Sequence, residues 1–319
     1  MSAAVPDGYS GDSPLMPPQS RGHFSTRIRT LLILAAAGCI LLAPGCKRRK
    51  PVVVGSKSST EQIILGEIIA QHVENRLHEP VARRLNLGVT SLVHESLAAG
   101  EIDVYPEYSG VAQAAILRLN VFPETQVVFD RVREVYKSNL QLDWLNPLGF
   151  ITPGVMVIRK DDAQKYNLDT LSDAEKSGVG WALGTTYDFQ QRADGMAALS
   201  RTYRLVSLTS PVVMDLAHLY QALDRKQVTM IPGNVTDGFL DPKKYKALRD
   251  DRSAFPPYQP SIVVRSQTET RLPALRPALD ELSGKITQDE MREMNRAVDI
   301  SKRTPAQVAT EFLRRAGLK

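Results

Sequence analysis

The sequence predicts an α/β protein whose body begins after residue 50 and contains two lobes, each a mainly parallel sheet flanked by helices. Three observations predict this fold. Strand-like and helix-like segments alternate along the body of the chain, which is typical of α/β folds. The length of 319 residues is enough for two domains of ordinary size. One helix–strand–loop plan also occurs in each half.

The first 50 residues indicate a targeting leader and a tether. Arg27 and Arg29 precede the apolar stretch LLILAAAGCILLAPGC (31–46), which has the length of a signal-peptide core and is short for a membrane span. Its end, with small residues before Cys46, resembles the lipobox of bacterial lipoproteins, so we expect Cys46 to be lipidated. Cys39 is the alternative lipidated residue, and an uncleaved anchor is the alternative to cleavage. In each case the body is expected outside the cytoplasm, held at a membrane.

The net charge of +5 belongs to this leader and tether. Residues 47–50 read KRRK, whereas residues 51–319 hold 33 basic and 33 acidic side chains. A neutral body argues against a nucleic-acid partner, and a basic cluster next to a lipid anchor adds electrostatic attraction to a membrane. Beyond Cys46 there is no cysteine, so we expect no disulfide in the folded body.

The first half of the body predicts strands and helices in alternation. In order, we expect a buried strand at 51–56, a helix from 60 to 77, a second helix from 90 to 99 and a strand at 102–105. Ser59 and Gln62 have the spacing of a capping box at the first helix. Gly100 is placed to end the second helix, and Pro106 is expected to break the strand.

The second half continues the alternation. We expect strands at 154–160, 179–184, 203–208, 228–233 and 261–265, helices near 191–200 and 213–224, and helices in the last 55 residues that start at 287 and 304. The helix starts at Thr287 and Thr304 carry capping residues, and Pro305 suits the first turn.

An internal similarity links the two halves. SLAAGEIDVYPEYSG and ALDRKQVTMIPGNVTDG both place a helix end, a polar turn, a strand and a loop with proline and glycine in the same order. Aligning Leu97 with Leu223 puts Tyr108 opposite Asn234, eleven residues on in each case. Two such units predict two lobes whose loops face a common cleft.

Signals for an enzyme are weak. The motifs HExxH, GxSxG and GxGxxG are absent from the sequence, so we predict neither a catalytic metal nor a nucleotide cofactor. Asp103 and Glu107 are the one carboxylate pair with a conceivable hydrolytic role, but a strand and its following turn favour structural roles for them. A cleft hydrolase is therefore a remote alternative.

The stretch GSKSSTEQ (55–62) leads a strand into a helix start. The free N–H groups and the positive dipole end there suit an anion. Hydroxyls of Ser58, Ser59 and Thr60 and the amide of Gln62 would surround it. Simple capping of the helix explains the same residues, and both interpretations stay open at this point.

Several segments together resemble the substrate-binding proteins of quaternary-amine ABC importers, the glycine betaine, choline and osmoprotectant family. GSKSSTEQIILGEIIAQ is similar to the family's GSKNFTEQ-type opening, and GEIDVYPEYSG to its GEIDLYPEYTGT segment. Similar segments follow in the same order, so the resemblance covers about 52–315; they read YDFQQRADG, GNVTDG and DDRSAFPPYQPSIVVR.

The resemblance implies a two-lobe periplasmic-binding-protein clamshell of type II. Lobe I would comprise 51–152 plus 263–319, and lobe II 153–262, after the leader 1–50. The family implies a monomer without enzyme activity or cofactor, which closes on a small solute and delivers it to an ABC permease and its ATPase.

Binding residues carry over position by position. Tyr108 and Tyr258 match two tyrosines of the family's cage for a quaternary ammonium, whereas Gly154 and Asn234 stand where the family has its other two. Polar pocket groups are expected at four positions: Gln62, Ser109, Thr236 and Asp237. Losing two rings removes on the order of 1–4 kcal/mol of cation binding. Asn234 can bond a polar head and Gly154 leaves room for a larger one, so an ergothioneine-like betaine, an amino acid or a sensor without transport are alternatives to a glycine betaine importer.

Overall fold

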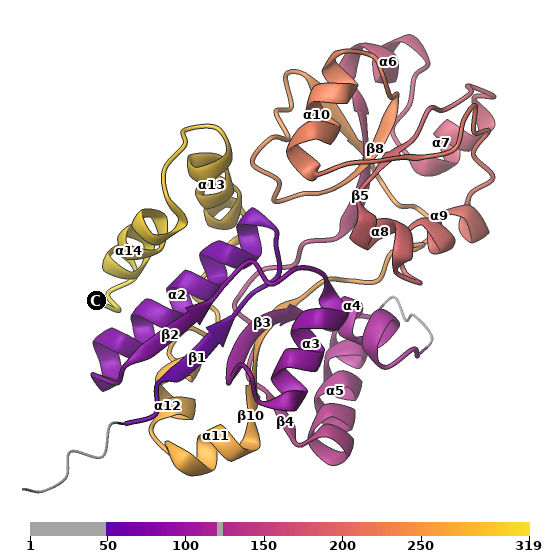
Figure 1. The fold of residues 1–319 in the computed structure, drawn as a ribbon. Coiled ribbons are helices and arrows are strands. Elements are labelled where there is room, and N and C mark those ends of the chain that lie inside the picture. Colours follow the sequence, from indigo (N-terminus) through magenta and orange to yellow (C-terminus); the bar gives the residue numbers. More distant parts are fainter. Residues whose placement is uncertain (1–48, 120–123) are drawn as a thin grey trace, which may run out of the picture. The chain divides into compact units, whose positions relative to one another are not determined.

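The computed structural model describes residues 49–119 and 124–319, and residues 49–319 form one compact unit (Figure 1). Cys39 and Cys46 lie outside the described residues, so the expected lipidation stays a prediction. Among the described residues, none of the helices has the length and apolar character needed to cross a bilayer.

The first sheet has five strands in the order β2-β1-β3-β10-β4. Its strands are β1 (Val52–Gly55), β2 (Val81–Arg84), β3 (Val104–Tyr108), β4 (Leu142–Trp144) and β10 (Pro260–Arg265). β1 runs parallel to β2 and β3, while β10 runs antiparallel to β3 and β4. The C-terminal strand β10 therefore lies between strands from the first half of the chain.

Helices cover both faces of this sheet (Figure 1). They are α2 (Thr60–Leu77), α3 (Thr90–Ala99), α4 (Ser109–Val111), α5 (Thr125–Val135), α11 (Ser266–Arg271), α12 (Leu275–Asp280), α13 (Gln288–Asp299) and α14 (Pro305–Arg315), with π-helical turns η1 (Ala112–Ile116) and η2 (Tyr136–Leu140). Val104 belongs to the core under α2 and α14, whereas its neighbour Tyr105 belongs to the core under α3 and α5. This alternation follows from the two-residue period of a strand.

The second sheet has three strands in the order β8-β5-β9, and all of its pairs are antiparallel. Its strands are β5 (Gly154–Arg159), β8 (Met230–Asn234) and β9 (Tyr245–Leu248), and β6 (Gly184–Thr185) pairs separately with β7 (Val212–Val213). The helices around it are α6 (Lys160–Lys165), α7 (Leu171–Lys176), α8 (Tyr187–Gln191), α9 (Met196–Thr202) and α10 (Leu216–Asp224).

Two segments connect the sheets side by side. The chain leaves β4 and enters β5 through residues 145–153, and it returns from β9 to β10 through residues 249–259. The Thr152 N–H donates to the Tyr258 carbonyl (2.9 Å), so the two segments are hydrogen-bonded to each other. The first segment leads into β5 and the second into β10. Both strands are antiparallel to their neighbours.

The predicted α/β class is confirmed, and several details differ. The second sheet is antiparallel where a mainly parallel one was expected. The stretch 203–208 forms no strand, and the predicted strand 179–184 is reduced to isolated bridges at Trp181 and Leu183 before β6. The glycines at 178, 180 and 184 leave the second of these segments little side-chain surface to fix a strand register.

Pro106 does not break β3, contrary to prediction. Pro106 pairs with Ile262 of β10, while the pairing of β1 with β3 is limited to Val54 and Val104. The β1 side of the strand is thus unpaired at Pro106, where a missing N–H removes no ladder hydrogen bond. The strand therefore continues to Tyr108.

The capping predictions are confirmed at the C-terminal helices and half confirmed at α2. Thr287 with Glu290, and Thr304 with Gln307, form complete capping boxes. At α2, Ser59 accepts from the Gln62 N–H (3.4 Å), but the Gln62 side chain makes no return bond among the described residues. The Gln62 amide is therefore left for another role.

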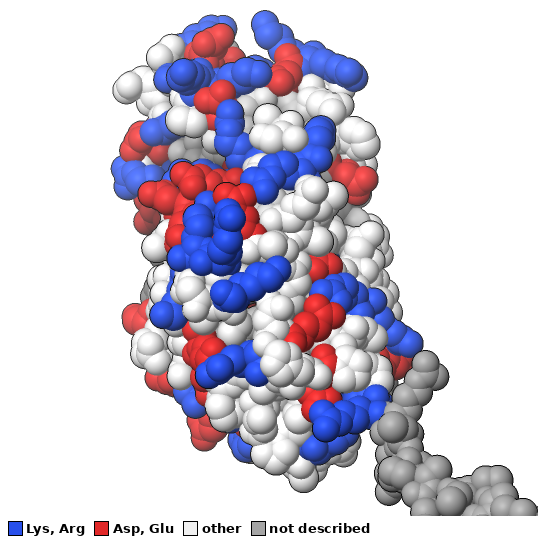
Figure 2. Space-filling view, turned by 90° about the vertical axis from the view of Figure 1, so that its left-hand side faces the viewer, with Lys and Arg blue, Asp and Glu red and all other residues white. Residues whose placement is uncertain are grey.

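Charged side chains are mixed on the surface. Figure 2 shows blue and red residues interspersed on one face, with white areas between them. No large area of one sign is visible on that face, which agrees with the neutral composition of the body.

Candidate functional site

The candidate site is built around two tyrosines at the junction of β3 and β10. Tyr108 ends β3 and pairs with Pro260, two residues after Tyr258. Their ring centroids lie 6.5 Å apart at an interplanar angle of 65°. Both rings are buried, and they form a small apolar cluster with Val111. The structure thus brings together the two cage tyrosines that the family resemblance implied.

Gly110 allows the segment that carries Tyr258 to approach β3. A Cβ atom at Gly110 would lie 2.7 Å from the Pro257 carbonyl oxygen and 2.9 Å from Pro256 Cβ. Backbone cannot yield at that distance, so the prolines before Tyr258 can pack here only against glycine. Gly110 therefore contributes to the spacing of the ring pair.

Tyr108 is held by charged residues on both sides. Its hydroxyl donates to Glu61 Oε1 (2.5 Å), and its N–H donates to Glu107 Oε1 (2.7 Å). Glu107 also accepts from Lys57 Nζ (2.5 Å), which lies 4.9 Å from the centroid of the Tyr108 ring. These distances place a cation against the ring, supplied by the protein itself.

Tyr258 is held by a second charged group. Its hydroxyl donates to Asp194 Oδ2 (2.8 Å) and accepts from Arg192 Nη2 (2.9 Å). Arg192 lies 5.4 Å from the ring centroid and also bonds both Asp194 oxygens and Asp188 Oδ2. Arg192 therefore uses most of its donors to hold Tyr258 and the two carboxylates.

Carboxyl groups outnumber cations around the ring pair. Four carboxyl side chains contact the two tyrosines or the residues that hold them, and two cations oppose them; the carboxyls are Glu61, Glu107, Asp188 and Asp194, and the cations are Lys57 and Arg192. The fixed charge of the site therefore favours a positively charged group.

Burial sets the ionisation of these carboxyls and of Asp237. It raises the pKa of Glu61, against the hydrogen bonds from Thr236, Tyr108 and Asn295, and it raises the pKa of Asp237 to about 7. Burial acts on Asp188 in the same sense, but Arg192 and Lys57 outweigh it and hold its pKa below the usual range. Asp188 is thus ionised at neutral pH, while Asp237 titrates there.

The two positions where the family has its other cage tyrosines are paired with each other on adjacent strands of the second sheet. Gly154 begins β5 and is the direct partner of Asn234, the last residue of β8. A Cβ atom at Gly154 would lie 3.2 Å from Tyr258 Cε2 and 3.3 Å from Phe255 Cγ. The space expected to be open over Gly154 is therefore filled by these two rings, and Asn234, which is half-buried, is the member of the pair with solvent access.

The other predicted polar residues fall into two groups. Thr236 and Asp237 lie beside the site: Thr236 Oγ1 bonds Thr152 Oγ1 (2.9 Å), and Asp237 accepts from the Asn234 N–H (3.0 Å). Gln62 and Ser109 are fully buried, and their side chains have no hydrogen-bond partner among the described residues. Such groups are costly unless something satisfies them, and here they adjoin Tyr108.

The three hydroxyls at the start of α2 are not brought to the ring pair. Ser58 and Ser59 are exposed, Ser59 caps the helix, and Thr60 donates to Asp299 Oδ1 (2.6 Å). In the described part of the chain, no hydrogen bond joins any of them to Tyr108 or Tyr258. The capping interpretation of these hydroxyls fits their contacts.

Sequence reasoning missed the charged residues that hold the rings. Lys57 and Glu61 lie inside GSKSSTEQ, and Arg192 and Asp194 lie inside YDFQQRADG. Their proximity to the singled-out motifs was the available signal. A single sequence does not distinguish these buried charged residues from charged residues exposed to solvent, because their burial depends on contacts between segments far apart in the chain.

The two carboxyls considered for a hydrolytic role, Asp103 and Glu107, are both engaged by other residues. Asp103 accepts from the Val53 N–H (2.9 Å) and from Thr268 (2.6 Å), and Glu107 is occupied by Lys57 and Tyr108. The described residues contain no group of three or more His, Cys, Asp or Glu able to hold a metal ion.

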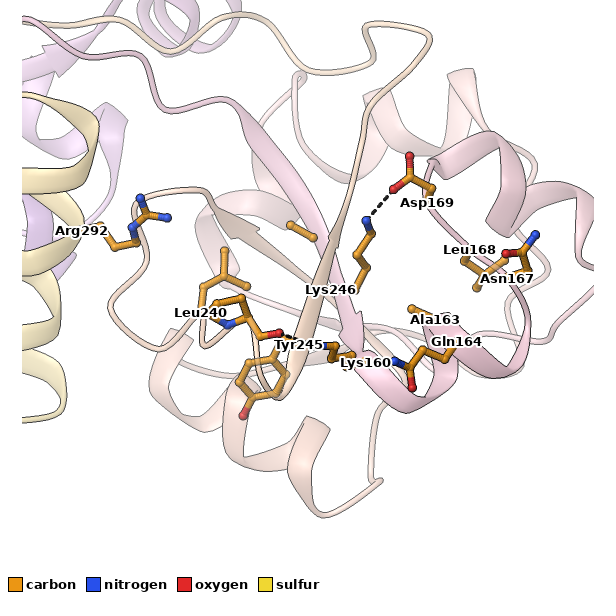
Figure 3. A pocket seen from close by; sticks show the side chains of 12 residues that line it. Lys160, Ala163, Gln164, Asn167, Leu168, Asp169, Leu240, Tyr245, Lys246 and Arg292 are labelled. Carbon is orange, nitrogen blue, oxygen red and sulfur yellow. Dashed lines mark hydrogen bonds and ion pairs between the residues drawn. The ribbon is translucent and has the colours of Figure 1, made fainter.

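A separate cavity of about 560 Å³ lies beside α6 and β9 (Figure 3). Its charged residues already have partners: Lys246 pairs with Asp169 (2.5 Å), and Lys160 donates to the Pro242 carbonyl (3.1 Å). It contains none of the residues that form the candidate site.

Fold and site together define a class of protein, the solute-binding proteins with a two-lobe clamshell fold of type II. A solved structure described as a glycine betaine/carnitine/choline ABC transporter superposes with a TM-score of 0.70 at 26% identity, over 84% of this chain and 99% of that one. The model of the family "substrate binding domain of ABC-type glycine betaine transport system" matches residues 50–315, so the chain belongs to this family.

Two relatives of the chain are named for different solutes. The chain is 33% identical over 302 residues to the ergothioneine transport permease/ergothioneine binding protein of Helicobacter pylori; this covers 94% of the chain and 54% of that protein, so the chain spans about half its length. It is 28% identical over 284 residues to the carnitine transport binding protein of Listeria monocytogenes, covering 88% of the chain and 92% of that protein.

Proposed function

We propose that the chain is the extracytoplasmic solute-binding protein of an ABC importer, which captures a small quaternary-amine or zwitterionic solute between its lobes and delivers it to a permease. The observation that carries this proposal is the buried Tyr108–Tyr258 pair surrounded by an excess of carboxyl groups. Aromatic faces attract a cation through their quadrupole, and the surplus negative charge acts in the same sense.

The assignment of lobes follows the two sheets. We assign 51–152 plus 263–319 to lobe I and 153–262 to lobe II, as the sequence suggested. Membership of the strands supports most of this assignment, since β1 to β4 belong to the first sheet and β5, β8 and β9 to the second. β10 joins the first sheet from Pro260, three residues before the boundary at 263. Tyr108 then belongs to lobe I, and Tyr258 lies on the returning connection.

The solute is a cation or a zwitterion rather than an anion. Lys57 is paired with Glu107, and Arg192 with Asp188 and Asp194. Each cation would have to give up a partner before it could bind an anionic ligand group. Polar contacts can come from Gln62 and Ser109, whose side chains are buried and unpaired in the described part of the chain.

An ergothioneine-like betaine is the subtype that a specific observation favours. Asn234 presents an amide where the family has a ring, and the named relative from Helicobacter pylori combines a permease with an ergothioneine binding protein. An amide can form hydrogen bonds with a polar heterocyclic group of the solute, whereas the face of a tyrosine ring could only pack against it.

Calorimetry on ligand-stripped protein tests the proposal. The panel should contain glycine betaine, choline, carnitine, ergothioneine and a neutral amino acid. We expect one of the trimethylammonium solutes to bind and the neutral amino acid to bind more weakly. Failure of every trimethylammonium member of the panel to bind would contradict the proposed function.

Substitutions at Tyr108 test the site within that experiment. Tyr108→Leu keeps apolar volume but removes the ring face, which should weaken binding about 2- to 30-fold. Tyr108→Phe keeps the face and loses only the Glu61 hydrogen bond, so it should retain more affinity than Tyr108→Leu. Tyr166→Ala, at a tyrosine remote from the site, is the control and should bind as wild type. Equal affinity of all three variants would remove Tyr108 from the site.

A further inference from the structure

A hydrogen-bonded path connects the two rings through the C-terminal helix α13. The Tyr108 hydroxyl donates to Glu61 Oε1, and Glu61 Oε2 accepts from Asn295 Nδ2 (2.9 Å). The same amide donates to the Thr236 carbonyl (2.8 Å). One buried side chain on α13 thus joins the start of α2 to the loop after β8.

The path continues from that loop to the backbone of Tyr258, which carries the second ring. Thr236 Oγ1 bonds Thr152 Oγ1 (2.9 Å), and the Thr152 N–H donates to the Tyr258 carbonyl (2.9 Å). Tyr108 and Tyr258 therefore stand at the two ends of one chain of hydrogen bonds. Asn295 is its central member and is only 3% exposed.

Close packing of the loop on α13 supports the same connection. A Cβ atom at Gly238 would lie 2.7 Å from the Arg296 nitrogen and 2.7 Å from the Asn295 carbonyl carbon. The loop 236–238 thus rests directly on the helix backbone beside Asn295. Because closely packed surfaces do not deform continuously, this contact fixes the position of the loop relative to α13.

We infer that Asn295 is a positioning residue for ligand binding, which ties the Glu61–Tyr108 pair to the docked 236–238 loop and so fixes the separation of the two rings. This inference rests on the proposed function of the ring pair. Asn295 itself contacts neither ring, so it acts through Glu61 on one side and Thr236 on the other. Removing its amide would take away the donor to Glu61 Oε2 and leave the buried carboxyl with the Tyr108 hydroxyl on its other oxygen.

Three variants test the inference. Asn295→Leu removes both donated hydrogen bonds at similar volume. Asn295→Asp keeps the shape but places a carboxyl beside Glu61. Glu293→Ala changes an exposed residue of the same helix and serves as the control. Affinity for glycine betaine and for ergothioneine is measured by calorimetry at pH 8 and pH 5, always relative to wild type at the same pH, because Glu61 and Asp237 also titrate.

We expect Asn295→Leu to bind about tenfold or more weakly at both pH values. Asn295→Asp should bind weakly at pH 8 and recover at pH 5, since a proton shared with Glu61 restores a donor. A change in side-chain volume or shape alone would not produce this recovery. Wild-type affinity in Asn295→Leu, or equal weakening of Asn295→Asp at both pH values, would overturn the inference.

Hydrogen exchange separates failure of this inference from failure of the proposed function. In the full chain without ligand, Asn295→Leu should speed exchange in both segments 104–111 and 234–240, whereas Glu293→Ala should not. If wild type bound no trimethylammonium solute of the calorimetry panel, the proposed function would fail, and exchange would still decide whether Asn295 connects the segments. Unchanged exchange in both would overturn the connection.

Discussion

At the scale of single residues, Asp237 is the group whose charge changes in the physiological range. Burial raises its pKa to about 7, whereas the unfolded chain has the ordinary value of 3.8. Between these values the folded protein binds more protons than the unfolded one. The stabilising contribution is therefore present below pH 3.8 and is lost as the pH rises through 7.

Asp237→Asn should flatten this dependence. Wild type should lose about 1–3 kcal/mol of unfolding free energy from this group between pH 5 and pH 8, and the variant should lose less. Urea unfolding across that range measures the difference, with Asp161→Asn as an exposed control. A variant that follows the wild-type curve would show that Asp237 is already ionised at pH 5.

Single residues also show what could be read from the sequence. The family motifs singled out Tyr108, Tyr258 and Asn234, which lie at the end of β3, in the connection before β10 and at the end of β8. Lys57, Glu61 and Arg192 were missed because their partners come from other segments. The room expected over Gly154 is absent because Phe255, a residue without a motif of its own, packs on it.

At the scale of elements, α13 is more than a cover for the first sheet. It packs on α2 through its apolar face, where Met291 and Met294 join the core, and it presents Asn295 and its backbone to the loop 236–238. The capping box at Thr287 predicted where this helix starts. Its contact with the loop after β8 could not be predicted, because Gly238 looks like an ordinary loop glycine in sequence.

Gly238→Ala should separate this loop from α13. The added methyl group would meet backbone at 2.7 Å, and overpacking of this kind costs roughly 1–3 kcal/mol. Chemical denaturation should show this loss, while Lys243→Ala, exposed in the same connection, should leave stability unchanged. Unchanged stability of Gly238→Ala would mean that the loop can lift from the helix at no cost.

Strand direction shows a further limit of sequence at this scale. Strand and helix alternation predicted parallel sheets, and the β2-β1-β3 part of the first sheet has them. β5 and β10 run the other way because each receives the chain from a connection between sheets. Hydrophobic periodicity reports that a segment is a strand, but it carries no information on the direction from which the chain arrives.

At the scale of the whole molecule, charge is divided between tether and body. The body is neutral in composition, and its charged residues are interspersed on the face seen in Figure 2. The excess of basic residues lies in the leader and in the KRRK segment, not in the body. We propose a lipid anchor at Cys46, because it stands next to that basic segment and ends the apolar stretch.

Cysteine substitutions test this anchor in the full chain. Cys46→Ser should abolish incorporation of labelled palmitate and move the protein from the membrane to the soluble fraction, because a basic segment alone binds a membrane weakly and reversibly. Cys39→Ser is the matched control and should stay labelled and membrane-bound. Raising the salt concentration should release any residual Cys46→Ser protein, since screening weakens the attraction of KRRK. If Cys46→Ser kept the label and Cys39→Ser lost it, Cys39 would be the lipidated residue. The anchor would then lie seven residues nearer the N-terminus, away from the basic segment.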